Sequence, residues 1–179
     1  MQAVEQLRLM ASYNALMNER IYGAARSLPP ERVTADRKAF FGSLLGTLQH
    51  LVNADTIWLQ RFANHPAGFG ALAPVLALST PAALNAQAFT DIDSMWRRRR
   101  QLDEVITAFT AALQPEHLDD HLAYSSMKGI PFNKPFFGVL LHFFNHQTHH
   151  RGQATTLLSQ EGADVGVTDL LTLIPDEEN

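Results

Sequence analysis

The chain is organised around His142-Phe-Phe-Asn-His146-Gln-Thr-His149-His150-Arg151-Gly152-Gln153, a run that holds four of its eight histidines. On a helix, positions four apart lie one above the other. Two histidine pairs have this spacing, His142 with His146 and His146 with His150. The neighbouring apolar residues fall on the side of His146 and His150, whereas Arg151 falls on the far side. The helical phase therefore predicts that His146 and His150 point inward and that Arg151 faces solvent.

Two imidazoles that face an apolar interior need partners for their ring nitrogens once water is removed. Coordination of one divalent cation would satisfy both rings, because histidine is the commonest metal ligand. The spacing is that of the helical zinc proteases, although the glutamate beside their first histidine is absent. Alternatively, both rings are core or pocket histidines bonded to protein groups. The spacing alone leaves both interpretations open.

Length, composition and charge exclude several kinds of fold and binding partner. A length of 179 residues suits one domain over residues 1–179. The absence of cysteine excludes disulfides, thiolate ligands and a cysteine nucleophile. A formal charge of −4 without a sustained basic face argues against a nucleic-acid partner. The chain has neither the apolar run of a signal peptide nor that of a membrane span, so we expect a cytoplasmic protein without a membrane partner.

Apolar spacing and helix-breaking residues predict the secondary structure. We expect long helices at about residues 3–28, 40–62, 91–113 and 135–161. Pro29 and Pro30 should stop the first helix. Asn133 should cap the last helix, Pro135 should open it and Gly162 should end it.

The connections between the helices differ in length and composition. Residues 64–90 predict a long crossover with one short helix after Pro81. Residues 116–134 predict a short hairpin or an irregular loop before the last helix. The tail from residue 167 is apolar and should pack on the helices. Four long helices with one long crossover favour an all-α four-helix bundle.

Three polar residues interrupt the apolar seams of the helices, and each needs a partner if it is buried. Asn14 either bonds a neighbouring helix or lines a polar pocket. Arg99 either pairs with Asp55 or holds an anionic substrate, and pairing is favoured because an unpaired buried carboxylate is costly. The other arginines of the run Arg97–Arg100 should lie on a solvated face.

The second helix carries a histidine at the border between its apolar and polar sides. His50 has small neighbours one turn away on either side, Thr47 and Ala54, which leaves room for a ligand to approach the ring. A single histidine at such a border is ordinary. The polar side should face solvent, and it comprises Gln49, Asn53, Thr56 and Gln60.

Taken together, these segments resemble the DinB/YfiT-like family. The resemblance is carried by Asn145–Gln153, Gly46–Asp55, Trp58–Phe62 and the tail Gly166–Leu171. It implies a four-helix bundle of the DinB/YfiT-like type, in which His50, His146 and His150 bind one divalent metal ion such as zinc or nickel. It also implies a homodimer.

Three neutral imidazoles leave at least one coordination position open, as in catalytic sites. Relatives in the family include thiol-dependent transferases, so the resemblance implies a metal-dependent transferase that uses a small-molecule thiol. The chain has no cysteine, and the thiol would therefore be a cosubstrate. Gln153 is the best-placed residue to orient a ligand ring, and Asn14 and Arg99 are weaker pocket candidates. The alternatives are a metal-dependent hydrolase, which lacks a carboxylate base in either motif, and a non-catalytic metal-binding or dimeric scaffold protein of the stress response.

Overall fold

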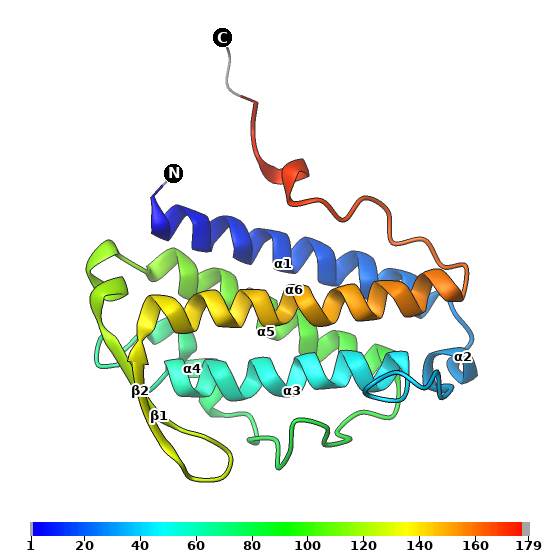
Figure 1. The fold of residues 1–179 in the computed structure, drawn as a ribbon, viewed down its shortest axis with the longest axis horizontal. Coiled ribbons are helices and arrows are strands. Elements are labelled where there is room, and N and C mark those ends of the chain that lie inside the picture. Colours follow the sequence, from blue (N-terminus) through cyan, green and yellow to red (C-terminus); the bar gives the residue numbers. More distant parts are fainter. Residues whose placement is uncertain (1, 177–179) are drawn as a thin grey trace.

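Four long helices lie side by side in the computed structural model, which describes residues 2–176 (Figure 1). They are α1 (Ala3–Arg26), α3 (Leu44–Phe62), α5 (Ile92–Ala112) and α6 (Phe136–Gln160). Their apolar faces meet in one core that includes Leu7, Leu48, Ile106 and Phe143. The structure thus confirms the predicted all-α four-helix bundle.

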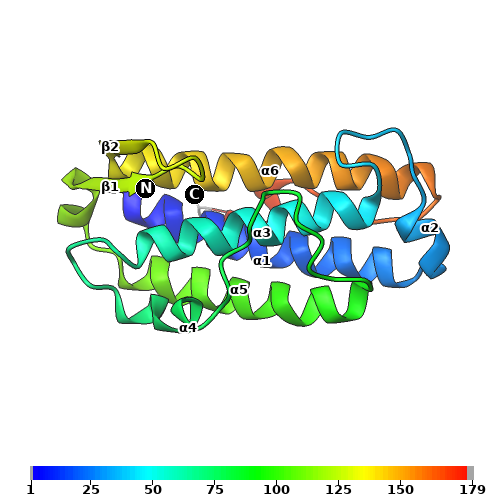
Figure 2. The same ribbon diagram turned by 90° about the horizontal axis from the view of Figure 1, so that it is seen from below.

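The order of the helices around the bundle brings α3 and α6 together. α1 packs against α5 and α6, and α3 packs against the same two helices. Figure 2 shows α1 and α6 running in one direction and α3 and α5 in the other. Helices α3 and α6 are therefore antiparallel neighbours, and the faces that carry the histidines of the two sequence motifs can meet.

The second long helix begins later than the sequence predicted. Ser43 caps α3 at its N-terminus, where its hydroxyl accepts a hydrogen bond from the Gly46 amide at 3.0 Å. The residues before it form a tight turn that includes Gly42, with a φ of 76°. A short helix, α2 (Pro30–Thr34), follows the end of α1. The predicted start near residue 40 was wrong because this turn replaces the first helical turn.

The crossover between α3 and α5 covers the outer side of α3, as Figure 2 shows. Its helical parts are η1 (Gly70–Leu72) and α4 (Ala73–Leu76), which lie before Pro81 and not after it as predicted. The Gln49 side-chain oxygen accepts hydrogen bonds from the amides of Ala88 and Phe89, and Asn53 donates to the Ala86 carbonyl. The side of α3 that was expected to face solvent is therefore largely buried by the crossover.

A β-hairpin precedes the last helix, as one of the two sequence alternatives predicted. It follows η2 (Pro115–Asp119) and consists of β1 (His121–Ser125) and β2 (Pro131–Pro135). The strands are antiparallel, with Leu122 opposite Lys134 and Tyr124 opposite Phe132. Asn133 lies within β2, so it does not cap α6. Pro135 takes the cap position, because its extended backbone turns directly from the strand into the helix.

The chain ends in a tail that lies along α1 and contains η3 (Leu170–Leu173), as Figure 1 shows. Gly162, with a φ of 74°, ends α6 as predicted and turns the chain into this tail. The Tyr13 hydroxyl donates to the Thr168 carbonyl at 2.6 Å. The apolar side chain of Leu171 nevertheless remains 73% exposed. Within the described residues, no helix is long and apolar enough to cross a membrane.

Candidate metal centre

Three histidines from two helices converge at the contact between α3 and α6. The Nε2 atom of His50 lies 3.1 Å from that of His146 and 3.2 Å from that of His150. One ligand atom from each ring falls within 4.8 Å of the others. Nitrogens bound tetrahedrally to zinc at about 2.0–2.1 Å are roughly 3.3 Å apart. The three rings are therefore spaced as ligands of one ion would be.

Hydrogen bonds on the far side of two rings fix which nitrogen faces the centre. The Nδ1 atom of His50 lies 3.2 Å from the Leu84 carbonyl oxygen, which can only accept. The Nδ1 atom of His150 lies 2.9 Å from the side-chain oxygen of Gln153, whose amide nitrogen contacts His149. Because both partners are oxygen acceptors, each Nδ1 atom is assigned the proton of its ring. The Nε2 atoms of His50 and His150 are then both unprotonated acceptors.

Two acceptors at 3.2 Å repel each other unless a positive charge lies between them. An N–H group of His146 can be shared with these acceptors, but it cannot place a hydrogen between His50 and His150. A divalent cation would accept a lone pair from all three rings at once. The donor set of the centre therefore fits a metal ion better than it fits hydrogen bonds within the protein.

The electrostatic surroundings keep the three rings neutral. Burial, reinforced by the neighbouring imidazoles, lowers the pKa of His50 to about 4 and that of His146 to about 3. Burial also lowers the pKa of His150, although its hydrogen bond to Gln153 opposes this shift. Neutral imidazole is the form that binds metals, so the ligands need not lose protons at neutral pH.

An aromatic ring forms one wall of the centre. The Phe41 ring stacks on His50 with 4.1 Å between centroids and meets the edge of His150 at 5.4 Å. The loop reaches this position because Gly46 has no side chain: a Cβ atom there would clash with the Phe41 carbonyl oxygen. His50 is consequently buried, whereas His146 and His150 are half-buried, so solvent reaches the centre from the α6 side.

The phase of α6 differs from the prediction by about one residue. His146 and His150 lie at the edge of the buried face, and its middle is occupied by Gln147 and Arg151. Arg151 is only 4% exposed, so the expectation that it faces solvent was wrong. It was misplaced because the predicted phase of α6 was off by about one residue, which moved Arg151 out of the buried face. The pair His146 and His150 was nevertheless the one that meets His50, and His142 lies outside the cluster.

A network of buried polar side chains links all four long helices behind the centre. Arg99 donates to Asp55 at 2.6 Å and lies 3.1 Å from Asp103, which confirms the predicted pair of Arg99 with Asp55. Asn14 donates to Asp103 at 2.7 Å and accepts a hydrogen bond from Arg151. Asn14 therefore bonds neighbouring helices, which was one of its two alternatives.

The structure places the three candidate pocket residues, Gln153, Asn14 and Arg99, in different parts of the bundle. Gln153 contacts His150 directly, as its position one turn further along α6 predicted. Asn14 and Arg99 lie in the interior network, and none of their hydrogen bonds within residues 2–176 goes to the three histidines. The structure therefore brings only Gln153 to the centre.

Several residues that shape the site were not predicted from the sequence. Gln147 donates to Asp55 at 2.8 Å, and the pair Gln147 and Arg151 shares the four-residue spacing of the histidine pair. That repeated spacing was a usable signal for a buried polar ladder. Phe41 and the Leu84 carbonyl gave no such signal, because loops bring them to the site from distant parts of the chain.

Comparison with known proteins gives two matches. The DinB family model matches residues 1–178. Protein DinB of Bacillus subtilis (strain 168) is 27% identical over 157 residues, which are 88% of this chain and 87% of that relative. No solved structure matches the chain significantly.

Proposed function

The chain belongs to the DinB family, and on that premise we propose that it binds one divalent metal ion, zinc or nickel, through His50, His146 and His150. The observation that carries this proposal is the 3.2 Å contact between the Nε2 atoms of His50 and His150, two acceptors without a hydrogen between them. Imidazole nitrogen suits both metals. Within residues 2–176, no carboxylate joins the cluster.

The reaction that we propose is transfer of a small-molecule thiol to an electrophile. A divalent ion held by these three neutral imidazoles would keep at least one position open and would lower the pKa of a water or thiol bound there. Because the chain has no cysteine, the thiol must come from a cosubstrate. The residues of the chain hold the ligands in place: Gln153 orients His150, and Phe41 keeps water from one side of His50.

The surroundings of the centre support thiol transfer over hydrolysis. Hydrolysis with a dedicated carboxylate base would need an acidic side chain near the bound water. Asp55 is the carboxylate that follows His50 on α3. It is fully buried and accepts hydrogen bonds from Arg99 and Gln147. A thiol that has already lost its proton to solvent requires no such base.

Cobalt-loaded protein provides the test of this proposal. Addition of glutathione, bacillithiol or mycothiol should produce a thiolate-to-cobalt charge-transfer band with at least one of them, and the same thiol should then react with electrophiles in the zinc- or nickel-loaded protein. The band should be absent from His146→Ala. Tight cobalt binding without a band for any thiol would refute the thiol proposal and favour a non-catalytic metal-binding protein.

Two further expectations remain proposals. The first is a homodimer, which is supported by apolar side chains of the tail that stay exposed beside α1, namely Val167, Leu171 and Ile174. The second is a cytoplasmic location. Light scattering of the purified chain at several concentrations would test the first, and a monomer at every concentration would refute it.

A further inference from the structure

A hollow lies on the same α3–α6 seam as the histidine centre, next to the hairpin. We refer to it as the hairpin groove, and its volume is about 390 Å³. Trp58 of α3 lines it together with Tyr124 and Lys134 of the hairpin and Gly138 and His142 of α6. The groove is therefore built from three separate elements that meet at one end of the seam.

The hairpin groove adjoins the histidine centre through one side chain. Trp58 lies two turns after His50 on α3, a rise of about 12 Å. On antiparallel α6, His142 lies one turn before His146. The His142 ring is 5.4 Å from the Trp58 ring and 6.0 Å from the His146 ring, measured between centroids. His142 thus lies between the groove and the centre, within reach of a small molecule bound in the groove.

The walls of the hairpin groove suit a flat, unsaturated molecule. The Trp58 ring meets the Tyr124 ring at 5.2 Å and 63°, so the two form adjacent walls of different orientation. The floor is open at Gly138, where an added Cβ atom would have no neighbour within 4 Å. Aromatic side chains bind planar ligands by stacking or by edge contacts.

The charge of the hairpin groove favours an anion. The lining includes Lys134 and no acidic residue. The Lys134 ammonium contacts the Phe132 ring at 5.4 Å, and the Arg61 guanidinium lies over the rings of Trp58 and Tyr124 at 4.6 and 5.0 Å. Within residues 2–176, neither cation has a carboxylate partner. Lys134, the cation of the lining, therefore complements a planar carboxylate beside the aromatic walls.

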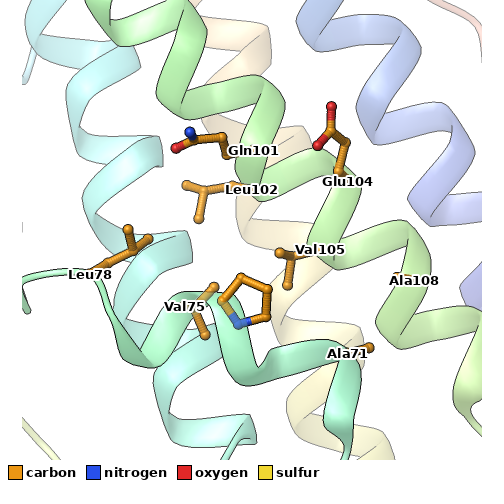
Figure 3. A pocket seen from close by; sticks show the side chains of 9 residues that line it. Ala71, Val75, Leu78, Gln101, Leu102, Glu104, Val105 and Ala108 are labelled. Atoms are coloured by element: carbon orange, nitrogen blue, oxygen red, sulfur yellow. The ribbon is translucent and has the colours of Figure 1, made fainter.

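A second hollow of about 390 Å³ lies between α4 and α5 and lacks these features (Figure 3). Its walls are mainly aliphatic, as Val75, Leu78 and Leu102 show, and its polar groups are Gln101 and Glu104. It includes no aromatic ring, no cation and no part of α6. The chemistry of this hollow therefore gives no indication of a ligand, whereas that of the hairpin groove does.

We propose that the hairpin groove binds a planar aromatic or unsaturated carboxylate and presents it to the histidine centre. Trp58 and Tyr124 would contact the flat body of the ligand, and Lys134 would pair with its carboxylate. This inference rests on the proposed metal-dependent activity, because it assigns the substrate class of the same site. Binding in the groove nevertheless requires only residues of this chain, so it can be measured without metal.

The test uses Trp58 as a reporter in a chain treated with a chelator. The chain has two tryptophans, so Trp96→Phe leaves Trp58 as the single tryptophan. Titration with 2-naphthoate should quench its fluorescence to saturation, and 2-naphthalenemethanol should bind at least fivefold more weakly. Lys134→Gln should weaken naphthoate binding roughly two- to fivefold, whereas Lys128→Gln on the same hairpin should have no effect. Equilibrium dialysis of Trp58→Ala should show a loss of roughly tenfold.

Three results would overturn the inference. They are no saturable binding of 2-naphthoate, equal binding of the neutral alcohol, and binding that requires metal and ignores Lys134→Gln. The last result would mean that the carboxylate binds the ion directly. Metal binding is measured separately. If naphthoate binds as expected while His50, His146 and His150 bind no metal, the proposed function is refuted and the ligand site in the hairpin groove is supported.

Discussion

Folding lowers the pH at which the three histidines of the centre take up protons, because burial disfavours the charged imidazole. In the unfolded chain each would titrate near the ordinary value of about 6.5, whereas the folded pKa is about 4 for His50 and about 3 for His146. Between these values the unfolded state binds more protons than the folded state. The stability of the metal-free protein should therefore fall as the pH falls below 6.5.

Urea unfolding of metal-free protein at pH 7.0, 5.5 and 4.5 measures this effect. We expect the midpoint to fall at each step. The double variant His50→Gln and His146→Gln serves as the control, because glutamine does not titrate, and its midpoint should fall less over the same range. Equal falls in the two proteins would mean that the histidine pKa values are not depressed.

At the scale of single residues, sequence patterns predicted candidate metal ligands and one ion pair correctly, but they predicted the burial of side chains less well. The helical phase of the neighbouring apolar residues selected His146 and His150 over His142, and the cost of a lone buried carboxylate indicated that Asp55 pairs with Arg99. The partner of Arg151 was not predicted, because nothing in the local sequence reveals that Asn14 of another helix will accept its hydrogen bond. Such partners are defined only by the packed bundle.

At the scale of elements, the loop before α3 and the first turn of that helix form one unit. Gly46 allows the Phe41 carbonyl to pack against the helix, and this contact holds the Phe41 ring on His50. Gly46→Ala should therefore lower the free energy of unfolding by about 1–3 kcal/mol, as overpacking typically does. Gly23→Ala in α1 is the matched control. An added methyl there has open space, so it should stabilise the protein by about 0.5–1 kcal/mol.

Urea unfolding of both alanine variants gives the two free energies. Opposite signs would support the close approach of Phe41 to α3. Stabilisation of both variants by similar amounts would show that the loop does not pack against Gly46 in solution.

The sequence predicted helices, strands and turns correctly where they depend on neighbouring residues of the chain. The third long helix, the hairpin and the stop at Gly162 depend on capping, alternation and a positive φ, and all three are found in the structure. Two element predictions failed for non-local reasons. The polar side of α3 is covered by the crossover, which supplies backbone partners to Gln49 and Asn53. Asn133 pairs within a strand because the hairpin extends up to the start of α6.

At the scale of the whole molecule, one polar network connects the four long helices. Arg99 lies at its middle, next to Asp55 of α3 and Asp103 of its own helix. Removal of this charge would leave two buried carboxylates short of a partner, so Arg99→Leu should lower the free energy of unfolding by about 3–5 kcal/mol. Arg100→Leu is the control, because Arg100 is exposed one residue further along. It should change stability by less than about 0.5 kcal/mol.

Chemical denaturation of the two leucine variants provides the comparison. A difference below about 1 kcal/mol between them would mean that the network contributes little to folding. Its residues would then serve mainly to select the arrangement of the helices, which is an alternative use of buried ion pairs.

The proposed metal centre spans two helices, and the metal content of purified protein tests it most directly. Untagged protein should contain close to one zinc or nickel ion per chain when measured by mass spectrometry. His142→Ala should keep this content, while His50→Ala, His146→Ala and His150→Ala should each lose most of it. Metal retained in His146→Ala but lost in His142→Ala, or no metal in the parent even after loading, would contradict the proposed centre.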